Sequence, residues 1–310
     1  VVKPIDESCG KGVEKLKIDK IVQTIFLIIG LICASTIIFI ILFIFIKGIK
    51  PFVSKYDGEQ NANLFYFLFG TTFLKGKYGA LGIVINTLFI VTLATLIAVP
   101  ISVLTALFIV RIAPKKLGAI LQNIVELLAS IPSIIFGLFG MGVINKIVKN
   151  IAYVFNLQTA GGVSLISVVT VLIMMIVPTI TMLAVTSMKA VKENLVWASL
   201  SLGATTTQTN FKIILRGAKS GIIAATILGI GRALGEATAV SMVCGGAIGI
   251  ALNPFKPTST ITSTMLQGIY ESSGVNYDIR FSLGILLIIL IIGVNLLLNY
   301  VKKKVMKNEK

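Results

Sequence analysis

The chain has 310 residues, of which 56% are hydrophobic and 13% are charged, and its mean hydropathy is +0.98. A soluble domain must present a polar surface to water, so this composition excludes one and indicates an integral membrane protein. The net charge of +16 does not indicate a nucleic-acid partner. The lysines stand in blocks beside apolar runs rather than in a separate basic domain, so we exclude nucleic acid and expect a lipid bilayer instead.

About six apolar runs are long enough to cross a hydrocarbon core of about 30 Å, which takes roughly 20 helical residues. They predict an all-α fold, a polytopic membrane helix bundle with about six transmembrane helices. In chain order the predicted spans are 21–46, 81–110, 124–144, 163–186, 220–243 and 281–300.

The remaining segments are two predicted tails, 1–20 and 302–310, and an external loop, 47–80, that precedes a core at 81–301. The run 21–46 is too long for a signal peptide and lacks a cleavage pattern, so we expect a retained helix. Basic residues number about 18 in the tails and in the connections near 111–116 and 187–219, against about 9 on the other side. Because positive charge favours the cytoplasmic side, both termini are predicted to be cytoplasmic.

The external stretch contains "GTTFLKGKY", Gly70 to Tyr78, which superficially resembles a nucleotide-binding loop. Five residues separate Gly70 from Gly76, where such a loop has four. Tyr78 stands where magnesium binding requires Ser or Thr. The chain is therefore not expected to hydrolyse ATP alone.

Prolines and glycines interrupt the predicted helices. Pro100, Pro132 and Pro178 lie inside the second, third and fourth spans. Such breakers are tolerated in a membrane where neighbouring helices or a water-filled cavity satisfy the backbone, so we expect a packed bundle. In the fifth span, Gly231 and Gly235 form a G-x-x-x-G spacing, which predicts close packing against another helix.

Arg232 and Glu236 are charged residues in the apolar stretch "GIGRALGEATAV", residues 229–240. An arginine near the bilayer midplane costs about 2.5–3.5 kcal/mol and needs a partner. Glu236, four residues later, is expected to share its helical face and supply one. Two interpretations stay open: an ion pair that only holds the bundle together, or an arginine that meets an anion in transit. A guanidinium suits the second, because it gives phosphate or carboxylate oxygens two parallel hydrogen bonds.

Glu126 is a third ionisable candidate for the translocation path. It lies at the start of the third span, in "IVELLASIPSIIFGLFG". At the membrane interface a solvated carboxylate would need no special role, so Glu126 is a weaker candidate than Arg232.

The connection before the fifth span carries a second pattern. Ala198 to Gly203, followed by Ile213 and Leu215, resembles the EAA loop of ABC-importer permeases, whose pattern is E-A-A, three residues, G, nine residues, I-x-L-P. Trp197 stands in place of the glutamate, Ser199 in place of the second alanine, and Arg216 in place of the proline. The glycine permits a left-handed turn. The resemblance implies a coupling loop, 190–216, that docks into an ATP-binding subunit, and its candidate contact residues are Trp197, Ala198, Ser199, Gly203, Ala204, Ile213 and Leu215.

Four further stretches occur in order: "ELLASIPSIIFGLFG", "LGATTTQT", "ILGIGRALGEATAVSMV" and "GVNLLLNYVKKK". Together they resemble the membrane permease of the phosphate-specific ABC importer, a type I, MetI-type permease, and its C-type more than its A-type subunit. The resemblance implies a path, containing Arg232 and Glu236, between this chain and a second permease subunit. It also implies two ATP-binding cassette subunits and an external phosphate-binding protein.

The expected function is therefore a permease subunit of an ATP-driven importer of inorganic phosphate in the cell membrane. Three alternatives stay open: a permease for sulfate, molybdate or another oxyanion, a secondary anion transporter or channel without ATP coupling, and a non-transporting scaffold or sensor. An enzyme is not expected, because no nucleophile stands beside a base. We expect no cofactor and no metal, since the chain has no histidine and Cys9, Cys33 and Cys244 lack the spacing of a zinc site.

Overall fold

The computed structural model describes residues 7–53, 56 and 61–307. The ends of the two predicted tails, 1–6 and 308–310, and parts of the predicted external loop, 54–55 and 57–60, lie outside the described residues. The long helices are α1 (Glu7–Val53), α3 (Leu81–Leu107), α4 (Lys115–Ser130), α7 (Leu165–Lys189), α11 (Lys219–Gly235) and α14 (Gly274–Lys307).

Shorter elements connect these helices. The α-helices among them are α2 (Leu64–Phe69), α5 (Ser133–Phe139), α6 (Asn145–Val154), α8 (Glu193–Ser201), α9 (Thr206–Thr209), α10 (Leu215–Gly217), α12 (Thr238–Cys244) and α13 (Ile261–Leu266). Three π-helical segments directly follow α-helices: η1 (Phe108–Ile112), η2 (Gly140–Ile144) and η3 (Asn210–Ile214). Strands β1 (Phe73–Leu74) and β2 (Lys77–Tyr78) pair as an antiparallel hairpin.

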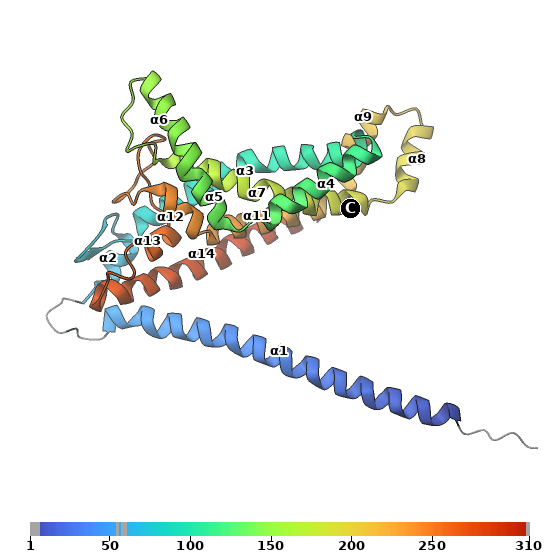
Figure 1. Ribbon diagram of the computed structural model, residues 1–310, viewed down its shortest axis with the longest axis horizontal. Coiled ribbons are helices and arrows are strands. Elements are labelled where there is room, and N and C mark those ends of the chain that lie inside the picture. Colours follow the sequence, from blue (N-terminus) through green and yellow to red (C-terminus); the bar gives the residue numbers. More distant parts are fainter. Residues whose placement is uncertain (1–6, 54–55, 57–60, 308–310) are drawn as a thin grey trace, which may run out of the picture.

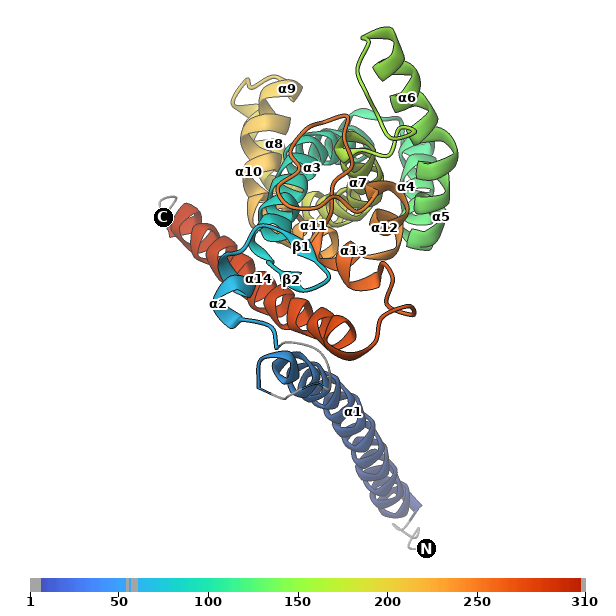
Figure 2. The ribbon, with the colours of Figure 1, turned by 90° about the vertical axis from the view of Figure 1, so that its left-hand side faces the viewer.

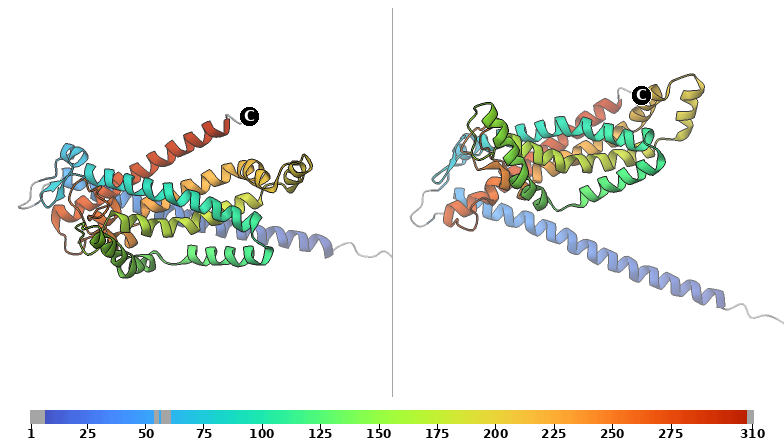
Figure 3. Two further views of the ribbon diagram at one scale, coloured as in Figure 1. Left: turned by 90° about the horizontal axis from the view of Figure 1, so that it is seen from above. Right: turned by 45° about the horizontal axis from the view of Figure 1, so that its top comes forward.

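The prediction of about six membrane-spanning helices is confirmed. In the described chain, 5 helices are long and apolar enough to cross a membrane: 22–53, 81–112, 133–154, 165–189 and 274–304. A bent pair, 206–217 and 219–235, with 65° between its halves, raises the number to 6 if the pair forms one span. Helices α3, α7, α11 and α14 run along the length of the molecule (Figures 1 and 3).

The core lies where α3, α7 and α11 pack together. Ile90 of α3 and Leu172 and Ile176 of α7 are completely or almost completely buried in one apolar cluster. Polar contacts also join these helices; between α3 and α7, for example, the Ser102 hydroxyl donates to the carbonyl oxygen of Val177 at 3.2 Å. Both Pro100 and Pro178 lie inside helices, as predicted.

Helix α1 contacts the bundle mainly at its C-terminal end. There the Asp278 carboxylate of α14 lies 3.6 Å from the ammonium groups of both Lys47 and Lys50 and accepts a hydrogen bond from the Tyr56 hydroxyl at 2.7 Å. Earlier in α1 the apolar side chains are exposed; Phe26 and Phe39 are each 69% exposed. Figures 1 and 2 show this part of α1 running away from the other helices.

Two of the predicted spans are wrong as continuous helices, because each is broken inside its predicted range. The span 124–144 is not continuous, because α4 ends at Ser130 and α5 begins at Ser133. Ile131 is extended (ψ 129°), as a residue before proline prefers, so Pro132 ends the helix rather than kinking it. The span 220–243 also breaks: α11 ends at Gly235, Glu236 is extended, and α12 begins at Thr238.

The expected close packing at the G-x-x-x-G spacing is also wrong for the described chain. A Cβ added at Gly231 or Gly235 would have no neighbouring atom within 4 Å. The close approach occurs at Gly229 instead, where an added Cβ would lie 2.7 Å from Cδ1 of Ile180 and 3.1 Å from Cγ2 of Ile176. Gly229 is therefore the glycine that lets α11 approach α7, and Gly231 lies beside open space.

Candidate functional site

A cavity of about 610 Å³ contains Arg232 and lies between three helices. Helix α7 contributes Thr179, and α14 contributes Asn295 and Asn299. Helix α11 contributes the remaining lining residues: Ala224, Ile227, Leu228, Gly231 and Arg232. The α11 wall therefore combines apolar residues with the Arg232 guanidinium, and the polar groups of the other two walls come from segments far apart in the sequence. We refer to it as the arginine cavity.

Arg232 lies in the last turn of α11 and is held by a neutral partner. Its Nη1 group donates a hydrogen bond of 2.7 Å to the Thr179 hydroxyl. That hydroxyl donates in turn to the carbonyl oxygen of Met175, at 3.3 Å, which leaves its oxygen lone pairs for the guanidinium. A guanidinium has five N–H donors. Most of its donors therefore remain available on the cavity side of α11.

The expected ion pair between Arg232 and Glu236 is wrong. The two ion pairs found among the described residues both involve Asp278. Because the helix ends at Gly235, the two side chains no longer share a face, and the Glu236 carboxylate turns to the next helix instead. Its Oε1 accepts the backbone N–H of Ala239 at 2.9 Å, and its backbone carbonyl accepts the Thr262 hydroxyl at 2.6 Å. Glu236 thus accepts a hydrogen bond from the first turn of α12 and does not neutralise Arg232.

Asn295 and Asn299 are the site residues that the sequence reasoning missed. They stand four residues apart in the apolar stretch "GVNLLLNYVKKK", so they share one face of α14. Their carboxamides make no hydrogen bond within the part of the chain that the structure describes. A polar side chain in hydrocarbon without a partner costs several kcal/mol, so this face of α14 is suited to water or to another polar chain. A signal was present, namely two carboxamides at helical spacing in an otherwise apolar run.

These groups suit an anion with several oxygens. The guanidinium supplies fixed positive charge, and the two carboxamides offer both donors and acceptors. A cavity of about 610 Å³ is much larger than a single tetrahedral oxyanion. Such an ion would therefore keep part of its hydration and be held weakly, as conduction requires.

Glu126 does not belong to this cavity. It lies on α4 with an exposed side chain, where its Oε1 accepts a hydrogen bond from the Gln122 carboxamide at 2.8 Å. The Oε1 of Gln122 accepts from the Lys189 ammonium at 2.6 Å. Glu126 therefore belongs to a short polar chain that links α4 to the end of α7.

The predicted coupling loop forms two short helices around a tight turn. Helix α8 ends at Ser201 and α9 begins at Thr206, and between them Gly203 has φ +83°, which confirms the predicted left-handed turn. The Thr205 hydroxyl accepts the backbone N–H of Gln208, whose side chain accepts that of Thr205, so a capping box starts α9. A hydrogen bond of 2.9 Å between Ser199 and Thr209 joins the two helices.

Buried and exposed residues divide the coupling loop into two faces. Val196 and Ile214 are buried against the ends of α3 and α7, which fixes the loop to the bundle. Trp197 is 64% exposed and Leu202, beside the turn, is 89% exposed. The candidate residues Ala198 and Gly203 are also exposed, while Ser199, Ala204, Ile213 and Leu215 are partly buried. Figure 1 shows α8 and α9 projecting at one end of the molecule, opposite to α2.

Comparison with known proteins identifies relatives that match most of the chain. The model of the family "Binding-protein-dependent transport system inner membrane component" matches residues 98–307. The "Probable ABC transporter permease protein YqgH" of Bacillus subtilis is 30% identical over 282 residues, which cover 89% of this chain and 88% of that protein. The "Phosphate transport system permease protein PstC" of Pasteurella multocida is 29% identical over 286 residues, 85% of this chain and 88% of that protein.

The fold has a counterpart among solved structures. A chain of the bacterial alginate ABC transporter, crystallised in complex with an alginate pentasaccharide-bound periplasmic protein, superposes with a TM-score of 0.61. The alignment covers 95% of this chain and 98% of that chain at 17% sequence identity. At this identity the likeness establishes the fold alone.

Proposed function

Because the chain belongs to the family of binding-protein-dependent transport system inner membrane components, we propose that it is the permease subunit of an importer of inorganic phosphate. The substrate assignment is supported by the Pasteurella multocida relative, which is named as a phosphate transport permease and is matched over 88% of its length. It is supported independently by the chemistry of the arginine cavity, which offers a guanidinium and neutral polar groups to an oxyanion.

One observation carries the proposal: the Arg232 guanidinium is held by the neutral Thr179 hydroxyl, and its expected carboxylate partner lies elsewhere. A fixed positive charge in an apolar bundle is costly unless an anion or water accompanies it. A passing phosphate ion supplies that compensation during transport. Between transport events, water in an open cavity does so.

The face that carries Arg232, Asn295 and Asn299 is proposed to form the translocation path together with a second permease subunit. A polar face of this kind is stable in a membrane when it lines a water-filled space between protein chains. Glu236 would then not contact the ion. It would support the path indirectly, by stabilising the break between α11 and α12.

The energy is proposed to come from separate ATP-binding cassette subunits that dock on the coupling loop. Trp197 and Leu202 present large apolar side chains around the Gly203 turn, as anchors for a cleft in a partner would. The loop end and both chain termini would then be cytoplasmic. An external phosphate-binding protein would deliver the ion at the opposite end, near α2.

Arg232→Gln tests this proposal in cells that depend on the transporter for phosphate. Uptake of radiolabelled phosphate should be abolished, while the variant still assembles and co-purifies with the ATP-binding subunit. Arg232→Lys keeps the charge but loses the bidentate geometry, so it should retain a small part of the uptake. Wild-type uptake by the Gln variant would make Arg232 a structural residue and refute the path.

Two alternative functions are separated by the wild-type transporter. Excess unlabelled sulfate or molybdate should not compete with phosphate uptake; strong competition would reassign the substrate to another oxyanion. The chain reconstituted alone in liposomes should not conduct phosphate without its ATP-binding partner. Conduction by the isolated chain would favour a secondary transporter or channel.

A further inference from the structure

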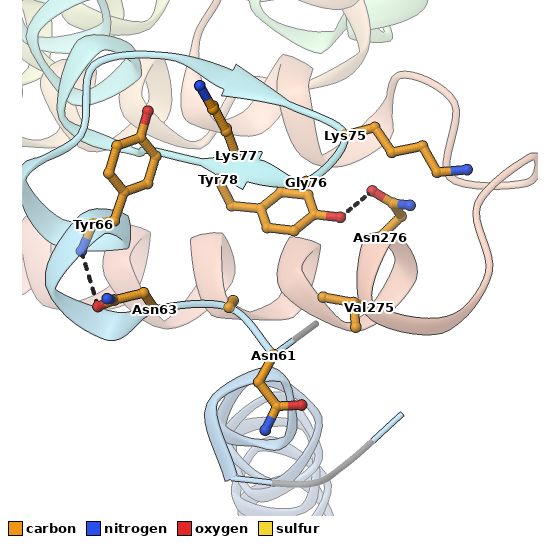
Figure 4. Close-up of a pocket in the computed structure, with 10 residues that line it drawn as sticks. Asn61, Asn63, Tyr66, Lys75, Gly76, Lys77, Tyr78, Val275 and Asn276 are labelled. Atoms are coloured by element: carbon orange, nitrogen blue, oxygen red, sulfur yellow. Dashed lines mark hydrogen bonds between the residues drawn. The ribbon is translucent and has the colours of Figure 1, made fainter. Parts of the chain in front are cut away.

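A second polar cavity, which we call the hairpin pocket, lies at the end of the molecule opposite to the coupling loop. Its volume is about 560 Å³, and its walls are the segment before α2, α2 itself, the β1–β2 hairpin and the first turn of α14 (Figure 4). The hairpin is the stretch "FLKGKY", part of the sequence that superficially resembles a nucleotide-binding loop. Its polar lining includes Asn61, Asn63, Lys75, Lys77 and Asn276.

The acceptor oxygens of two of these carboxamides are already occupied within the chain. Asn63 Oδ1 accepts the backbone N–H groups of Phe65, at 2.9 Å, and Tyr66, at 3.4 Å, so its orientation is fixed. Asn276 Oδ1 accepts the Tyr78 hydroxyl. Figure 4 shows the bonds from Tyr66 to Asn63 and from Tyr78 to Asn276 on two walls of the pocket. The NH₂ groups of Asn63 and Asn276 donate no hydrogen bond within the described residues, so both are available to a partner as donors.

The charged residues of the hairpin pocket also favour a partner that accepts hydrogen bonds. Lys75 and Lys77 are exposed, and neither takes part in the ion pairs found among the described residues, which both involve Asp278. Among the described residues, those that line the pocket include no aspartate or glutamate. The pocket therefore presents ammonium and amide N–H donors and is complementary to carboxylate oxygens.

We propose that the hairpin pocket is a docking site for carboxylate side chains on the surface of the external binding protein. This inference rests on the proposed function, which places that protein at this end of the molecule. On α2, Phe65 and Phe69 are 72% and 60% exposed and lie 4.9 Å apart. Exposed aromatic side chains beside a polar recess are typical of protein interfaces.

The test uses the assembled transporter in nanodiscs and the phosphate-loaded binding protein carrying a fluorescent label. The double variant Lys75→Glu, Lys77→Glu reverses the charge of the pocket. The matched control, Lys146→Glu with Lys149→Glu, makes the same change on exposed lysines of α6 that do not line the pocket. We expect the pocket variant to bind the labelled protein at least tenfold more weakly and the control variant to bind it as wild type does. The difference should shrink as salt screens the charges.

A charge exchange on the other partner makes the test specific. Binding-protein variants with single surface Asp or Glu residues changed to Lys should include one that binds wild-type transporter weakly and the pocket variant strongly. Wild-type affinity of the pocket variant, or an equal loss in the α6 control, would overturn the proposal. So would an effect of the pocket variant on binding of radiolabelled phosphate without the binding protein, since the ligand would then be the free ion.

The docking proposal and the proposed function fail in different ways. If docking alone is impaired, phosphate uptake by the pocket variant should return to the wild-type maximum at saturating binding protein, because the arginine cavity is unchanged. A wild-type transporter that binds the loaded protein at the hairpin pocket but never imports phosphate would refute the proposed function and leave the docking site standing.

Discussion

Thr179→Val isolates the contact that holds Arg232 in the arginine cavity. Valine keeps the size and branching of threonine but removes the hydroxyl that accepts the 2.7 Å hydrogen bond from Arg232 Nη1. A hydrogen bond to a charged group contributes about 1.5–3 kcal/mol, and each 1.4 kcal/mol corresponds to about tenfold. If the bond orients the guanidinium toward a passing ion, phosphate uptake at subsaturating concentration should fall about ten- to one-hundred-fold.

Two controls on the same helix separate positioning from folding. Thr179→Ser keeps the hydroxyl and should transport nearly as wild type does. Thr170→Val removes a partly buried hydroxyl that, like that of Thr179, donates to a carbonyl four residues earlier, but one that does not contact Arg232. Its uptake should be unchanged. Initial rates of radiolabelled phosphate uptake, normalised to the amount of assembled transporter, measure all three. An equal loss in both valine variants, or no loss in Thr179→Val, would refute the reasoning.

Three further predictions concern packing and the coupling loop. Gly203→Val should reduce co-purification of the ATP-binding subunit, because a β-branched residue opposes φ +83°; undiminished co-purification would remove the loop assignment. Gly229→Ala should lower the melting temperature in detergent, since overpacking against α7 costs about 1–3 kcal/mol. The control Gly231→Ala places its methyl group in open space and should leave the melting temperature unchanged. Equal melting temperatures of the two variants would contradict the packing described. Asp278→Asn removes the negative charge that two lysines of α1 share, and it should reduce the free energy of unfolding by about 1–3 kcal/mol. The melting temperature should therefore fall. An unchanged melting temperature would mean that these ion pairs do not hold α1 against the bundle.

The parts of the fold that could be predicted are those set by local composition. Long apolar runs specified the spanning helices because a hydrocarbon core requires about 20 helical residues. The turn at Gly203 was predictable because a left-handed residue is costly for every side chain except glycine. In both cases the physical cause lies within a few residues of the element that it determines.

The parts that could not be predicted depend on where helices end and on what faces them. Pro132 and Glu236 were predicted to lie inside continuous helices. Instead Ile131 and Glu236 adopt extended conformations, and a new helix begins two residues after each of them. Once α11 ends at Gly235, the helical spacing between Arg232 and Glu236 no longer brings them together. The guanidinium instead donates a hydrogen bond to the hydroxyl of Thr179, 53 residues earlier in the chain. No local sequence pattern predicts this contact.

The polar wall of the arginine cavity illustrates the same limit. Asn295 and Asn299 occur in a stretch that was recognised only as part of a family resemblance. Their significance follows from the packing of α14 beside α11, which brings two carboxamides into the same cavity as Arg232. A sequence pattern identifies one polar stripe at a time, and a site requires several helices to converge.

The central claim is that the arginine cavity opens to a water-filled phosphate path, and thiol accessibility tests it most directly. In a transporter with its three native cysteines replaced, Asn295→Cys should react with a charged, membrane-impermeant thiol reagent, and phosphate should slow the reaction. Leu296→Cys, at a position that is 66% exposed but does not line the cavity, should react poorly and without protection by phosphate. Equal, phosphate-independent labelling of the two positions, or labelling of Asn295→Cys only by an apolar reagent, would contradict the claim.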